Sequence, residues 1–473
     1  MRKLAAAILL LTTALQASAQ RGLTLGQAIE MARNNSNEAE ISENSYMKGL
    51  AEFEHFESTF KPHLELNVNP NYVREAYEFK ENFARVRDYD RLSAMAELSF
   101  SQKVTPLGGD FYAASSGVWT EHFSDDEAFP RLFGANPVRI GYQQQLLGYN
   151  PYKWERQVEN ARVKNVRSRH SREYWDIAGN TAGLYLDALR AREMYKMYLN
   201  NAETAEMLYR IGEQKYSIAS IRNDELSSLK LQWMNSRNNC RLTETEMASA
   251  FNSLTSYLGL EEGEMPELSI PEMPSRIILD RQMIYDLVEE NNPAYNKTEL
   301  DILSARSREE KARRETGLQA SMDVNIGLQN YAPEIRGAFG NQSFFSVSGI
   351  GLRIPIIDQK TARSKYKAAQ FETRAVEAES REELRKLRVE VDAAIRDFEN
   401  YQELIQEAES AMRLADEAYS QANDNYANGI ADINTFAIAQ DRKEKAWTNY
   451  LNILCRYWKA YYRLSSLCGS EIK

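Results

Sequence analysis

Apolar and polar positions along this chain repeat with two different periods, which change from region to region. From residue 384 onward, the steps between apolar residues alternate between three and four. The seam consists of Leu384, Leu387, Val391, Ala394, Phe398, Tyr401, Ile405, Ala408, Met412, Ala415, Tyr419, Ala422 and Tyr426. This heptad spacing predicts a helix packed as in a coiled coil. The helical pattern extends from about Lys360 to Tyr426, which at ~1.5 Å per residue is on the order of 100 Å.

A second seam with the same spacing lies earlier in the chain, at Thr181, Leu184, Ala188, Ala191, Tyr195, Tyr198, Ala202, Ala205 and Tyr209. One separation relates three pairs of residues: Tyr209 with Tyr419, Tyr216 with Tyr426, and Ala219 with Gly429. Residues 254–259 resemble 464–469, and residues 34–36 resemble 291–293. We therefore interpret the chain as a tandem duplication, with repeats at 20–264 and 265–473 and an insertion around 73–137.

Between the helical stretches of each repeat the period changes to two. Leu64, Leu66 and Val68 alternate with polar residues, and similar alternation recurs at 96–101, 138–142, 321–328 and 350–354. One apolar and one polar face predict half-buried strands. A soluble sheet packed on a core has this pattern, and so does a barrel with lipid outside and water inside. The insertion reads as extended strands or an outer loop, with a turn at 105–110.

The N-terminus has the features of a cleaved secretory signal. Arg2 and Lys3 precede a short apolar run, and Ala17 and Ala19 supply small residues where a signal peptidase cleaves. We expect residues 1–19 to be a signal peptide. No long uncharged apolar stretch follows it, which predicts no transmembrane helix. The mature chain would then span a membrane as a closed barrel or be soluble in an exported compartment.

Composition excludes several classes of function. A net charge of -10 and a pI near 5.3 argue against nucleic-acid binding. Cys455 and Cys468 would either pair or remain inert thiols on packed helices. The four histidines lack the spacing of metal ligands, and we find no Walker loop, serine elbow or complete dinucleotide fingerprint. We therefore expect no enzyme, metal or cofactor.

The order of these features resembles the TolC-type outer-membrane efflux proteins. Three segments carry the resemblance: 23–29 at the opening helix, 352–358 leading to 368–369 at the exit from strand to helix, and 426–433 at the turn joining the long helices. The resemblance implies a mainly α fold with β-hairpins, trimerising into a 12-stranded β-barrel on an α-helical barrel. Each subunit would supply four strands. It further implies an outer-membrane location, a helical tube in the periplasm, and docking of a periplasmic adaptor and an inner-membrane RND or ABC pump.

The resemblance also implies a gate at the periplasmic helix tips. In the family, acidic side chains after the turn ring the entrance and favour cations. The matching first-repeat position is Glu225, with Asp224 beside it. In the second repeat the acidic positions fall on Thr435 and Ile438, with Asp432 nearby at a different offset. Tyr426 and Gly429 belong to the turn itself. The same acids would also suit solvated residues at a helix N-terminus.

Two other classes of function remain open from the sequence. A periplasmic coiled-coil adaptor or scaffold would explain the long helices, although its usual lipoyl-like and barrel-like domains are not evident. An outer-membrane barrel enzyme would need a Ser/His pair at the wall, for which His63 and His122 are the candidates. The transported substrate and the energy source of the pump are not encoded in any motif we find.

Overall fold

The computed structural model describes residues 22–75, 89–106, 108–123, 131–261, 263, 265–272, 276–354, 356, 360–428, 430 and 433–472. The predicted signal peptide lies outside these residues. The chain divides into two compact units. One comprises Met1–Met47, Val166–Tyr295 and Leu384–Lys473, and the other Lys48–Asn165 and Asn296–Glu383. No helix among the described residues is both long enough and apolar enough to cross a membrane.

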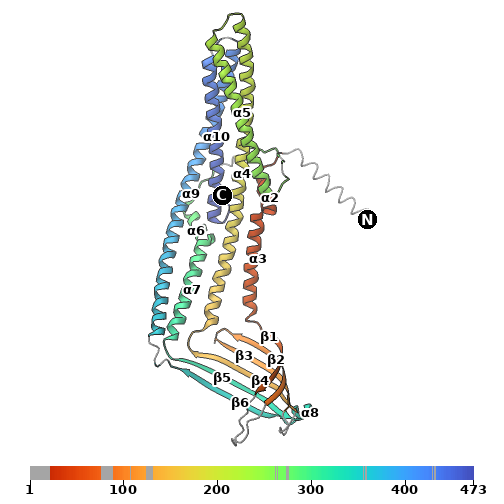
Figure 1. The fold of residues 1–473 in the computed structure, drawn as a ribbon. Coiled ribbons are helices and arrows are strands. Elements are labelled where there is room, and N and C mark those ends of the chain that lie inside the picture. The colour runs from red at the N-terminus through yellow and green to blue at the C-terminus, as the bar shows by residue number, and fades with distance from the viewer. Residues whose placement is uncertain are drawn as a thin grey trace, which may run out of the picture. The chain divides into compact units, whose positions relative to one another are not determined.

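The helices come in two matching sets (Figure 1). The first set is α2 (Leu25–Asn35), α3 (Asn37–Ser58), α4 (Pro151–Ser217) and α5 (Asn223–Leu258). The second is α6 (Arg281–Asn291), α7 (Pro293–Glu315), α9 (Thr361–Ala427) and α10 (Ile433–Cys468), with the short α8 (Ile335–Ala338) between strands. Helices α4 and α9 both have 67 residues, and α5 and α10 both have 36. The predicted duplication and the predicted long helix are confirmed.

The ends of the repeats match in backbone geometry as well as in sequence. Gly259 and Gly469 follow α5 and α10 with φ of 69° and 62°. In each case the next amide hydrogen-bonds to the carbonyl five residues back: Leu260 to Thr255, and Ser470 to Ser465. A left-handed residue at this position satisfies the last carbonyls of a helix, and glycine adopts it without steric cost. The exact boundary between the repeats stays a prediction.

The heptad seams form the helical core. In α9, Val391, Ala394 and Phe398 are fully buried against α10 residues such as Tyr457 and Leu464. In α4, Ala188 lies in a second cluster with residues of α2, α5 and α10. Seams buried between long antiparallel helices are the arrangement that heptad spacing favours.

Both C-terminal cysteines lie in this core as free thiols, so of the two predicted states the inert one is seen. Burial raises the pKa of Cys455 to about 11 and that of Cys468 to about 12.

Six strands form one antiparallel sheet in sequence order (Figure 1). They are β1 (His63–Glu75), β2 (Tyr89–Val104), β3 (Gly109–His122), β4 (Arg131–Leu147), β5 (Gln319–Ala332) and β6 (Ser343–Arg353). The predicted strands fall on β1, β2, β4, β5 and β6. The insertion forms strands, as one of its two readings predicted. The count differs from the four strands that the resemblance implied, because the first repeat contributes four and the second two.

Helix positions locate the extra strands. Helices α2 and α6 begin 256 residues apart, whereas α4 and α9 begin 210 residues apart. The first repeat therefore has 46 more residues than the second ahead of its long helix. An added hairpin accounts for them, and it leaves the direction of the last strand before α4 unchanged.

One face of the sheet is mostly apolar. Leu66 of β1 pairs with Leu98 of β2, and Ile140 of β4 pairs with Ile326 of β5. The opposite face is polar: Arg139 Nη2 of β4 donates to Glu97 Oε2 of β2 over 3.0 Å. Alternation along the strands separates the two faces, as the sequence predicted for β1, β2, β4, β5 and β6.

Glycines on the polar face make room for aromatic rings from neighbouring strands. A Cβ on Gly141 would lie 2.2 Å from the ring of Tyr112, on β3. In the same way, a Cβ on Gly134 would clash with the ring of Tyr331 of β5, and one on Gly327 would clash with the ring of Phe345 of β6. Glycines covered by cross-strand aromatics, together with bulges, curve and pin a sheet. The pairing of β3 with β4 has such a register shift between Ala114 and Ser116.

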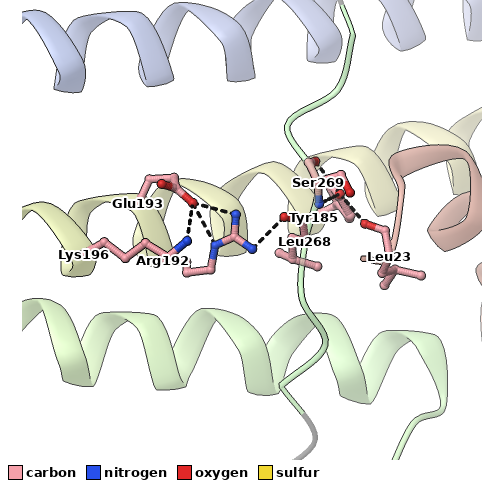
Figure 2. A network of polar contacts seen from close by, with 7 residues as sticks. All are labelled: Leu23, Tyr185, Arg192, Glu193, Lys196, Leu268 and Ser269. Carbon is pink, nitrogen blue, oxygen red and sulfur yellow. Dashed lines mark hydrogen bonds and ion pairs between the residues drawn. The ribbon is translucent and has the colours of Figure 1, made fainter. Parts of the chain in front are cut away.

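The segment joining the repeats is held against α4 by a polar network, which we call the linker clamp (Figure 2). Leu23 pairs with Leu268 as an isolated bridge. The buried Tyr185 hydroxyl accepts the Ser269 amide at 2.9 Å and lies 2.6 Å from the carbonyls of Leu23 and Ser269. Arg192 Nη1 donates to the Leu268 carbonyl over 2.6 Å. Burial raises the pKa of Tyr185 to about 12, so this hydroxyl stays protonated.

Candidate gate at the hairpin tips

The first hairpin tip joins α4 to α5 through residues 218–222. Its turn places Ala219 in the left-handed region, with φ of 57°. The Ser220 amide donates to the Lys215 carbonyl over 2.8 Å, and the Ile430 amide at the second tip donates to Asn425 over the same distance. Gly429, the predicted equivalent of Ala219, lies outside the described residues. The matching hydrogen bonds indicate that both long helices end in the same way.

The predicted acidic residues of the first tip lie in the first turn of α5. Asp224 and Glu225 are both solvent-accessible there. Arg222, the residue capping the helix, has Nη2 3.1 Å from the Asp224 carboxylate and Nε 3.7 Å from that of Glu225. Sequence reasoning missed Arg222, although its spacing of two and three residues from the acids was visible. The arginine offsets one of the two negative charges.

The second tip is held by aromatic packing. Phe436 of α10 is 0% exposed and its ring centroid lies 5.7 Å from those of both Tyr419 and Tyr426 of α9. Leu208 and Leu229, from α4 and α5, complete this cluster. Burial, followed by the charge of Glu225, raises the pKa of Tyr426. The two tips are therefore neighbours, and the charge of Glu225 is near enough to Tyr426 to influence it.

The other predicted gate residues are only partly brought into this cluster. Thr435 is exposed in the first turn of α10, and Ile438 is exposed nearby. Asp432 lies outside the described residues, so its role stays a prediction. Of the predicted set, the structure brings together Glu225 and Tyr426, with Asp224 beside them.

A polar layer crosses the helices behind the tips, and the sequence analysis did not find it. Asn201 Nδ2 of α4 donates to Glu444 Oε1 of α10 over 2.7 Å, and Gln440 Nε2 donates to the same oxygen over 3.0 Å. Gln232 Nε2 of α5 donates to Gln440 Oε1 over 3.2 Å. Burial is the main cause of a raised pKa at Glu444. Polar residues within a coiled-coil seam fix its register at some cost in stability.

The described residues of the tips are charged and aromatic. Groups of three or more His, Cys, Asp or Glu side chains that would hold a metal ion do not occur among the described residues. The tips instead combine exposed acids, one exposed arginine and an aromatic cluster. Charges around a narrow entrance select ions by sign.

Comparison with known proteins identifies the second half of the chain. A model of the outer membrane efflux protein family matches residues 284–470. Over this segment the chain is similar to the outer membrane efflux protein family. The match runs from within α6 through α10, and α4 and α5 of the first repeat have the same lengths as α9 and α10, which it covers. No curated protein matches the chain.

Solved structures share the fold over nearly the whole chain. The CmeC outer membrane channel of Campylobacter jejuni aligns with a TM-score of 0.66 and 11% identity, over 95% of this chain and 86% of that one. The outer membrane protein VceC of Vibrio cholerae gives 0.66 and 11%, over 95% and 97%. The open state of the MtrE channel of Neisseria gonorrhoeae gives 0.61 and 12%, over 95% and 89%.

These comparisons confirm the predicted resemblance and the mainly α fold with a β-sheet, whereas the predicted trimer stays a prediction. The family that matches residues 284–470 is one of outer-membrane efflux proteins, which agrees with the predicted location and with the prediction of a channel over an enzyme. His63 and His122, the only histidines considered for a barrel enzyme, lie at opposite ends of different strands, at the start of β1 and the end of β3.

Proposed function

We propose that the chain is the outer-membrane exit channel of a tripartite efflux or type I secretion system. It would act as a homotrimer, conduct substrates passively from an inner-membrane RND or ABC pump and a periplasmic adaptor, and be gated at the hairpin tips. The observation that carries this proposal is the combination, in one duplicated chain, of long helical hairpins with a sheet that is apolar on one face. A water-filled wall in lipid needs such a sheet.

The gate is proposed from the tip geometry. Asp224 and Glu225 place negative charge at the start of α5, and Arg222 reduces it. Repeated around a trimer, these groups give an entrance with a small net negative charge, which favours cations. Packing of the partly buried Tyr426 against the buried Phe436 holds the second tip in place near Glu225.

Single-channel conductance of the purified protein in a planar bilayer tests the proposal. We expect small, mostly closed, cation-selective events. The double variant Asp224→Asn/Glu225→Gln should lose cation preference, whereas Arg222→Gln should increase it. Asp432→Asn tests in the same way the acid predicted at the second tip. Glu272→Gln, an exposed acid in the linker, is the matched control and should leave selectivity unchanged.

The outcomes separate the proposal from its rival. Opposite shifts for the acid and arginine variants support a gate at these tips. Unchanged selectivity in both would remove the acids from the gate and leave a channel controlled elsewhere. A folded protein that never enters a bilayer would refute the channel and favour a periplasmic scaffold.

A further inference from the structure

The two edges of the sheet lack partners among the described residues. Strands β1 and β6 are the first and last in the sheet order. They span 13 and 11 residues, so each presents a long row of backbone donors and acceptors. Both edges also carry exposed apolar side chains, with Leu66 at 67% and Ile350 at 66%. Long, apolar edges of this kind pair with another chain.

The added hairpin, formed by β2 and β3, belongs to the same sheet as the other strands. The pairing of β1 with β2 runs without a break from His63 opposite Ser101 to Glu75 opposite Tyr89. The pairing of β2 with β3 is equally continuous, and β3 pairs with β4 up to Glu121. The apolar face continues across the hairpin through Leu98 and Trp119, which align with Leu66 of β1 and Phe133 of β4.

The direction of the strands makes identical copies able to close a ring. Six alternating strands leave β1 and β6 antiparallel to one another. Strand β6 of one copy can therefore pair with β1 of the next in the same antiparallel manner as every pair within the sheet. Such a head-to-tail contact repeats around a ring when the sheet is curved. The glycine–aromatic pairs and the register shift in β3–β4 supply curvature.

We propose that β6 of each copy pairs with β1 of the next, and that every copy contributes all six strands to the common wall. This inference rests on the proposed trimeric channel, in which three six-stranded sheets give eighteen strands, not twelve. Barrel diameter grows roughly linearly with strand number, and barrels of about 16–18 strands enclose an open aqueous channel. The outer-membrane end would then admit bulky hydrated solutes, and restriction would fall to the hairpin tips.

Cysteine cross-linking of the full chain in membranes tests the strand order. In a background without Cys240, Cys455 and Cys468, Leu66→Cys is combined in turn with Ser346→Cys, Ser348→Cys and Ile350→Cys, which lie on the same face of β6. Serine and exposed positions keep the substitutions mild. At least one pair should give covalent trimers on a denaturing gel. The matched control, Leu66→Cys with Leu98→Cys, should cross-link within one chain.

The rival arrangement places β2 and β3 outside the wall, so that β1 meets β4 directly. Leu66→Cys with Val138→Cys or Ile140→Cys would then cross-link efficiently, the control would fail, and a twelve-stranded wall would replace the one proposed. A verified trimer without any β1–β6 cross-link at the three positions would also overturn the inference. If the cysteine-free protein neither trimerises nor inserts, the proposed channel itself is wrong.

Discussion

The two repeats keep their long helices and differ in their strands and tips. Helices α4 and α9 are equal in length, as are α5 and α10, yet the first repeat has four strands and the second has two. A heptad seam ties every residue of a helix to its neighbours, so an insertion there would shift the whole register. A hairpin added to a sheet disturbs only the strands beside it. The long helices therefore keep the same length in both repeats, because their packing is cooperative along the chain, whereas the number of strands differs.

The tips differ in a related way. The first carries Arg222 with two acids, whereas the second buries Phe436 between two tyrosines. One repeat supplies exposed charge and the other supplies packing. A tandem duplication thus allows one copy to set the electrostatics of an entrance while the other holds it in shape.

The largest effect should come from the packed tip. Phe436→Ala should lower the free energy of unfolding of the tip region by about 3–5 kcal/mol, because it empties a fully buried aromatic site. The equivalent residue of the first repeat is Leu226, which is only partly buried, and Leu226→Ala should cost clearly less. Amide hydrogen exchange of the hairpin ends compares the two. Equal effects would show that the tips are not specialised.

The second comparison sets a glycine of the first repeat against one of the second. Gly141→Ala places a methyl group 2.2 Å from the Tyr112 ring, whereas a Cβ on Gly349 has no neighbour within 4 Å. Overpacking of this kind costs about 1–3 kcal/mol, so Gly141→Ala should melt at lower temperature and Gly349→Ala should resemble the parent. The strand circular dichroism signal during heating measures this. A tolerated Gly141→Ala would mean that Tyr112 moves away freely.

A third prediction concerns the polar layer, whose acidic residue, Glu444, belongs to the second repeat. The position equivalent to Glu444 in the first repeat is the exposed Met234. Because burial raises the pKa of Glu444, the folded state holds its proton more tightly than the unfolded state. The resulting stability is present below the unfolded pKa and is lost as pH rises through the folded pKa.

Glu444→Gln should therefore modestly stabilise the packed helices at pH 7 and flatten the pH dependence of their stability. Thermal melts across mildly acidic to neutral pH compare it with Glu417→Gln, an exposed acid on α9. A loss of stability at pH 7 would show that the charge is needed by Asn201 and Gln440.

The smallest effect on stability belongs to the charged tip. Glu225→Gln and Arg222→Gln alter accessible side chains, so the free energy of unfolding should change by less than about 0.5 kcal/mol. Denaturant titration of the two variants checks this. A larger change would mean that the ion pair supports the turn, and the selectivity results would then need a structural correction.

Most of the helical fold was predictable from the sequence because the buried seams appear as apolar residues at regular heptad spacing. Val391 and Phe398 fall on the seam and are buried. Strand β3 left a weaker mark, since Gly109, Ala113 and Gly117 interrupt its alternation. The positions of Asp224 and Glu225 followed from the resemblance. The pairing of Arg222 with them depends on how the chain enters α5, which residue spacing alone does not fix. The polar layer joins three helices and needs their packing to be known.

The linker clamp has a consequence for the order of folding. Leu23 is bonded to Glu267 and Ser269, and its bridge partner Leu268 lies 245 residues further along the chain. Contacts between such distant residues form late, because the intervening chain must first be ordered. The beginning of the first repeat can therefore form these contacts only after the beginning of the second repeat has been synthesised. A chain interrupted after α5 would lack the clamp, and its N-terminal segment would remain open to proteases although its own hairpin was complete.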